Sequence, residues 1–115
     1  MRYIYLIFSE ERPLVVGTDD NPDAGSALNR IFATEARLAG VYVSASTLQP
    51  TLTATTLRLS AGKPDVNDGP AVRTPLPLSG FVVLDVADER DALRWAARIP
   101  AATDGAVEVR QITYD

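Results

Sequence analysis

The chain has 115 residues and a mass of 12.4 kDa, enough for one domain around a single hydrophobic core. Its hydrophobic fraction of 46% and charged fraction of 23% exclude a chain that is disordered throughout. A net charge of -4 argues against a nucleic-acid interface, and the absence of cysteine and histidine excludes disulfides, thiolate zinc sites and histidine general bases.

The first predicted element is a strand over residues 3 to 8. Aromatic and branched residues occupy every position of Tyr3-Ile4-Tyr5-Leu6-Ile7-Phe8 without alternation, which indicates a strand buried on both faces. The run is too short to span a bilayer, and it is followed by Ser9-Glu10-Glu11 rather than by a cleavage site. We therefore expect no targeting signal and a cytoplasmic protein, and the arginine- and alanine-rich composition favours a bacterial source.

A helix is predicted over residues 23 to 39. Asn21 is the expected cap and Pro22 the first helical residue, although Gly25 and Ser26 allow a start nearer Ala27. Apolar residues follow at helical spacing, and Gly40 is placed to close the helix in a left-handed conformation. The next strand covers residues 41 to 47, with Val41, Val43 and Ala45 expected on one face and Tyr42, Ser44 and Ser46 on the other.

A β-hairpin is predicted after Pro50. Residues 53 to 60 are β-rich, Ala61-Gly62 permits a tight reversal, and residues 63 to 67 form the return strand. The turn signal Asn67-Asp68-Gly69-Pro70 then opens an extended loop that ends at Pro77.

The last third of the chain predicts a strand, a helix and a strand. Residues 79 to 86 are apolar on both faces, and Asp88 caps a second helix that ends at Pro100. The buried stripe expected on that helix contains Ala92, Trp95, Ala96 and Ile99. Residues 106 to 112 alternate and suit a sheet edge.

This order of elements predicts an α+β fold. Two split βαβ units with both helices on one face form a ferredoxin-like sandwich, here with an extra β-hairpin. The other face of the sheet would still be apolar, so we expect two copies to pack sheet on sheet as a dimeric α+β barrel. The alternative is a monomer whose hairpin folds over that face.

Several motifs along the chain carry a family resemblance. They are Met1-Arg2-Tyr3, Ala39-Gly40-Val41, Asp68-Gly69-Pro70, Gly80-Phe81, Trp95-Ala96-Ala97-Arg98-Ile99-Pro100 and Gly105-Ala106-Val107-Glu108-Val109-Arg110. In this order they resemble the YCII-related proteins of the DGPF type over nearly the whole chain, so residues 1–115 are identified as a single YCII-related domain. The resemblance implies a ferredoxin-like dimer from a largely uncharacterised family.

The sequence also departs from that family's pattern. Ala71 replaces the phenylalanine that follows Asp-Gly-Pro, and Pro75-Leu76 replaces a charged Lys-Glu pair. The His and Asp pair thought to form an active site in the wider YCII group is incomplete here, because the chain has no histidine. Some relatives occur beside or fused to extracytoplasmic-function sigma factors, which implies a sigma-factor-related regulator as a candidate partner.

The candidate site residues are polar groups on the predicted strands and at the Asp-Gly-Pro turn. Asp68 is the candidate catalytic carboxylate, with a turn residue as the structural alternative. The candidate ligand-binding residues are Tyr3, Tyr5, Tyr42, Ser44, Arg58 and Asp68. Glu10 and Glu11 lack the further oxygen ligands of a metal site, so we expect neither a metal nor a cofactor.

Two classes of function remain open. The sequence favours a homodimeric module that binds a small molecule or serves an accessory or regulatory role, without catalysis. The alternative is a cofactor-independent enzyme in which Asp68 removes a proton from a small substrate while Arg58 or a tyrosine stabilises the anion.

Overall fold

The computed structural model describes residues 1–11 and 27–114. Four strands form one antiparallel sheet in the order β2-β5-β1-β6, and two further strands form a separate hairpin, β3-β4. The strands are β1 (Arg2–Phe8), β2 (Tyr42–Thr47), β3 (Thr55–Ser60), β4 (Lys63–Asp68), β5 (Leu78–Asp85) and β6 (Ala106–Gln111). The helices are α1 (Ala27–Leu38), α2 (Glu89–Ala96), α3 (Ala101–Asp104) and the 3-10 turn η1 (Thr51–Thr53).

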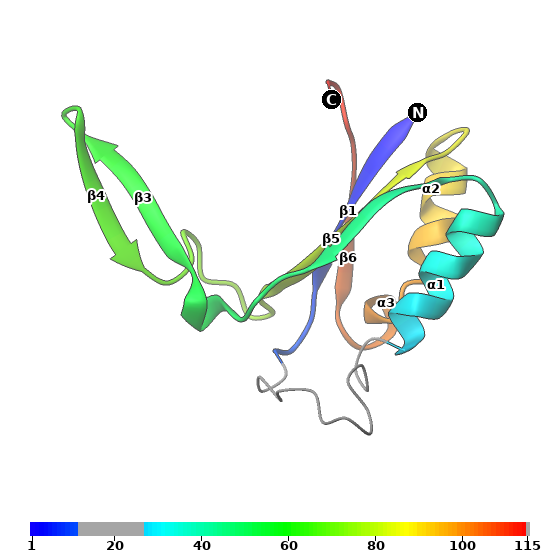
Figure 1. Ribbon diagram of the computed structural model, residues 1–115, viewed down its shortest axis with the longest axis horizontal. Helices are drawn as coiled ribbons and strands as arrows, with labels where there is room; N and C mark the ends of the chain where they lie inside the picture. The colour runs from blue at the N-terminus through cyan, green and yellow to red at the C-terminus, as the bar shows by residue number, and fades with distance from the viewer. Residues whose placement is uncertain (12–26, 115) are drawn as a thin grey trace.

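The strand order confirms the predicted α+β class with an antiparallel sheet. β1 and β5 are central and antiparallel, and each is joined through a helix to a parallel strand at the opposite edge, β2 or β6. These are the two split βαβ units expected from the element order. The helices lie together on one face of the sheet, and the hairpin projects on the other side (Figure 1).

The ends of the two main helices follow from local sequence. The carboxylate of Asp88 accepts a hydrogen bond from the Asp91 amide at 2.8 Å, which confirms the predicted cap of α2. Gly40, at φ +75°, ends α1 in a Schellman motif: its amide donates to Arg37 and the Val41 amide donates to Ala36. The expected cap Asn21, Pro22 and residues 23 to 26 of the predicted helix lie outside the described residues.

The core lies between the sheet and the helices. Tyr5 and Leu84 are fully buried, and Phe32 of α1 meets Trp95 of α2 edge to face at 5.9 Å between ring centroids. The stripe predicted for the second helix is confirmed, since Ala92, Trp95, Ala96 and Ile99 are all buried.

Three details differ from the predictions. Pro100 does not end the helical region, because it precedes the short helix α3. Ile31, which falls on the helical spacing of α1, is 56% exposed. A bulge between Tyr42 and Ser44 breaks the expected alternation of β2, so Tyr42 pairs with Leu84 on the helix side while Ser44 pairs with Val83 on the other face.

Candidate functional site

The face of the sheet opposite the helices is the candidate functional surface, and we call it the open face. Tyr3 and Tyr5 pair with the buried residues Leu84 and Val82, so this set of side chains points toward the helices. The alternate positions of β1 and β5 therefore form the open face. Its apolar stripe consists of Ile4, Leu6, Phe8, Phe81 and Val83.

The apolar stripe is only half-buried, although it lies on the two central strands. Ile4 is directly opposite Val83, and Leu6 is directly opposite Phe81. Adjacent cross-strand pairs of this kind form a continuous apolar surface. The stripe thus has the chemistry of a core but remains partly exposed to solvent.

Polar side chains border the stripe on both edge strands. Ser44 and Ser46 of β2 lie opposite Val83 and Phe81. On β6, Glu108 and Arg110 lie opposite Leu6 and Ile4, and they form an ion pair of 2.7 Å between Nε and Oε2. The open face therefore combines an apolar centre with hydroxyl groups along one edge and a charged pair along the other.

Tyr3, Tyr5 and Tyr42, which were expected to face a cavity between two sheets, lie instead on the helix side. Tyr3 is 5% exposed and Tyr5 is 0% exposed. The Tyr5 hydroxyl donates to the Ala92 carbonyl oxygen at 2.9 Å, and burial, with a smaller contribution from Asp91, raises its pKa to about 12. Tyr42 packs under the guanidinium of Arg37, 4.5 Å from its ring centroid. All three tyrosines have structural roles in the protomer.

Arg58 and Asp68 belong to the hairpin, and they lie on opposite faces of it. In the strand register Arg58 lies opposite Asp65, and its guanidinium donates a hydrogen bond of 3.2 Å to the Ala71 carbonyl oxygen. Asp68 pairs with Thr55 and is exposed. Of the six predicted ligand-binding residues, only Ser44 lies on the open face, and the structure does not bring the set together.

The apolar members of the open face were absent from the predicted site residues. Because every position from Tyr3 to Phe8 of β1 and most of β5 are apolar, the sequence did not indicate which set of residues the helices would cover. The alternation of the strands could have paired Ile4 with Leu6 and Phe81 with Val83, but assigning each set to a face required the three-dimensional arrangement.

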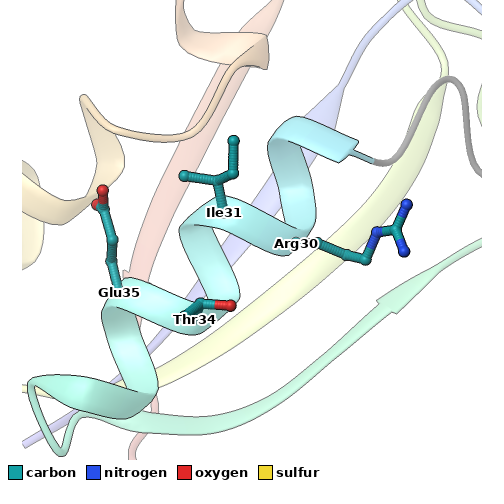
Figure 2. A pocket seen from close by; sticks show the side chains of 4 residues that line it. All are labelled: Arg30, Ile31, Thr34 and Glu35. Atoms are coloured by element: carbon teal, nitrogen blue, oxygen red, sulfur yellow. The ribbon is translucent and has the colours of Figure 1, made fainter.

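A shallow hollow of about 420 Å³ lies on the outer side of α1, lined by Arg30, Ile31, Thr34 and Glu35. Its side chains point in different directions and do not converge on a common point (Figure 2). Glu35 accepts a hydrogen bond of 3.4 Å from Arg98, which lies in the segment between α2 and α3. These contacts are those of a solvated helix surface rather than of a ligand site.

Within residues 1–11 and 27–114, acidic side chains form no group of three or more that could hold a metal ion. No helix in this part of the chain has both the length and the apolar character needed to cross a bilayer.

Residues 1–114 match the YCII-related domain. The chain belongs to the YCII-related family. This YCII-related chain is also similar to an uncharacterised protein of Rhizobium meliloti (strain 1021), with 37% identity over 89 residues that cover 76% of this chain and 68% of the relative. The resemblance predicted from the motifs is therefore confirmed, and this relative assigns no ligand or reaction to the YCII-related protein.

Proposed function

We propose that this YCII-related chain forms a homodimer in which two open faces pack against each other and hold a small, mainly apolar molecule between them. The resulting dimeric α+β barrel is a binding or accessory module that catalyses no reaction. The observation that carries the proposal is the half-buried apolar stripe on the central strands, Ile4, Leu6, Phe8, Phe81 and Val83.

The stripe lies on the two central strands of the sheet, where its partial exposure to water is energetically unfavourable. Removing apolar surface from water stabilises a protein by roughly 25 cal/mol per Å². Large contiguous apolar patches on soluble proteins mark interaction sites or ligand grooves. A second copy offers the same patch, and a two-fold axis lets each stripe cover the other.

The hairpin does not cover the open face within the same protomer. β3 and β4 pair only with each other and project away from the sheet (Figure 1). Every residue of β4 is exposed, as are all residues of β3 except the half-buried Thr56. The alternative of a monomer covered by its own hairpin is therefore not the arrangement in this structure.

The polar borders of the stripe suggest the chemistry of the bound molecule. A site between two sheets would have apolar walls and hydroxyl groups from Ser44 and Ser46 along one side. Such a site suits a small apolar molecule with one or a few hydrogen-bonding groups. The Glu108–Arg110 pair lies at the opposite edge, where it remains accessible to water.

The enzymatic alternative is less well supported by the geometry. A carboxylate base must lie within hydrogen-bond reach of its substrate, in surroundings that hold the substrate. Asp68 is exposed at the base of the hairpin, and the Arg58 side chain lies on the other hairpin face. Association with a sigma-factor-related regulator stays a prediction from the family resemblance.

Thermal denaturation with a panel of small apolar metabolites tests the proposal. A ligand at one hundred times its Kd stabilises the folded protein by about 2.7 kcal/mol, which raises Tm by several degrees. The test variant is Leu6→Asp on the open face, and the matched control is Leu38→Asp, since Leu38 is 84% exposed at the end of α1. We expect a ligand to stabilise the wild type and Leu38→Asp but not Leu6→Asp. Failure of the whole panel, or an equal response of Leu6→Asp, would overturn the proposal.

A further inference from the structure

The β3-β4 hairpin has one apolar and one polar face. The cross-strand pairs Leu57 with Val66 and Leu59 with Pro64 lie on one face, and the Thr55–Asp68 pair lies on the same face at the base of the hairpin. Leu57, Leu59 and Val66 are 60%, 70% and 60% exposed. The other face carries the pairs Thr56–Asn67, Arg58–Asp65 and Ser60–Lys63. The hairpin therefore presents a row of large apolar side chains to solvent.

Among the described residues, the hydrogen bonds to the hairpin are made on its polar face and at its base. The Thr56 hydroxyl donates to the Gly69 carbonyl at 2.7 Å, and the Arg58 guanidinium donates to the Ala71 carbonyl at 3.2 Å. The Gly69 amide donates to the Ala54 carbonyl at 2.8 Å at the base of the hairpin. These bonds hold the loop after β4 against the hairpin and leave Leu57, Leu59 and Val66 uncovered.

An isolated two-stranded hairpin is marginally stable in water, and it needs a further surface to pack on. The buried core of the described residues contains no member between residues 51 and 78, so the protomer's own core does not supply this surface. The hairpin and its apolar side chains are therefore arranged for a contact outside the protomer.

The position of the hairpin identifies the partner. It projects from the side of the sheet opposite the helices, which is the side of the open face (Figure 1). Six residues in an extended strand span roughly 20 Å, whereas two packed sheets lie roughly 10 Å apart. A hairpin of this length would pass the edge of a second sheet seated on the open face and reach the helix layer behind it.

We infer that the hairpin is a dimerisation arm: its apolar face, Leu57, Leu59, Val66 and Pro64, docks on the second copy of this chain. The inference builds on the proposed packing of open faces and adds a separate contact to it. In a two-fold dimer each protomer gives one arm and receives one, so both apolar surfaces of the protomer are covered.

The dimer dissociation constant, measured by sedimentation in the full chain, tests the arm separately from the open face. The arm variant is Leu59→Asp, and its matched control is Ser60→Asp, the next residue on the polar face of the same strand. Leu6→Asp tests the open face. Near-ultraviolet circular dichroism of Trp95, which lies in the core, checks that each protomer is folded. We expect Leu59→Asp to raise the dissociation constant at least about tenfold and Ser60→Asp less than about twofold.

The outcomes separate the two claims. If Leu6→Asp dissociates the dimer while Leu59→Asp and Ser60→Asp behave alike, the arm has no role and the packing of open faces stands. If Leu59→Asp dissociates the dimer and Leu6→Asp does not, the arm stands and the proposed function fails. A wild-type chain that is monomeric at micromolar concentration would overturn both.

Discussion

The Tyr5 hydroxyl donates a hydrogen bond of 2.9 Å to the backbone carbonyl oxygen of Ala92, which follows it by 87 residues. This bond joins the central strand β1 to the helix α2 at a fully buried position. Tyr3 and Tyr5 lie on the helix side of β1, so the alternate residues Ile4, Leu6 and Phe8 lie on the open face.

Replacing Tyr5 with phenylalanine should lower the free energy of unfolding by about 1 kcal/mol, since it removes this buried hydrogen bond and little volume. Chemical denaturation measures the change. Tyr114→Phe is the matched control, because Tyr114 is 91% exposed. An equal effect of the two variants would contradict the structural role of the Tyr5 hydroxyl.

The same residue predicts a loss of stability at alkaline pH. Burial raises the pKa of Tyr5 from 10.0 to about 12, so the folded protein favours the neutral phenol more than the unfolded chain does. The corresponding stabilisation, roughly 2 to 3 kcal/mol, is fully present below pH 10 and is lost as the pH rises toward 12. Denaturation of the wild type and Tyr5→Phe over this range should show the loss only in the wild type.

The Asp88 cap should contribute measurably to α2. Asp88→Ala removes the acceptor of the Asp91 amide and should destabilise the protein by about 1 kcal/mol. Asp88→Asn keeps a capping oxygen and should retain most of the stability. The denaturation midpoints of the two variants measure the difference. Equal losses of stability in Asp88→Ala and Asp88→Asn would show that the charge of Asp88, rather than its capping hydrogen bond, stabilises α2.

Asp85 should titrate below its usual range. The Met1 ammonium group donates to its carboxylate at 2.9 Å and lowers the pKa of that carboxyl, with a smaller contribution from Arg2. The stabilisation from this pair is therefore present above about pH 4 and is lost as the pH falls through the lowered pKa. Carbon-13 NMR of the carboxyl should give a midpoint below 3.8. Acetylation of the Met1 amine should move it upward, and a midpoint at or above 3.8 before acetylation would contradict the pairing.

Much of the fold could be predicted because local chemistry and the global arrangement agree. Uninterrupted apolar residues identified β1 and β5 as central strands, and their pairing confirms this. The structure confirms the predicted helix cap at Asp88 and the predicted left-handed helix end at Gly40. The predicted reversal at Ala61-Gly62 is also present, with φ values of +51° and +78°. These signals act over a few residues, so the sequence alone contains them.

The candidate site was harder to predict because it depends on which side of a strand the helices cover. From Tyr3 to Phe8, both alternating sets of residues on β1 are apolar, and a tyrosine hydroxyl can find a partner on either side. The bulge after Tyr42, which places Tyr42 and Ser44 on different faces, has no distinct sequence signal. The position of Asp68 fits the turn interpretation of Asn67-Asp68-Gly69-Pro70, since Gly69 adopts φ +103° next to it.

Sedimentation equilibrium of the wild-type protein at low micromolar concentration directly tests whether a second copy of the chain covers the open face. We expect a single species with twice the protomer mass of 12.4 kDa, and we expect Leu6→Asp to convert it into a folded protomer. A stable, folded wild-type protomer with no tendency to associate would contradict this expectation.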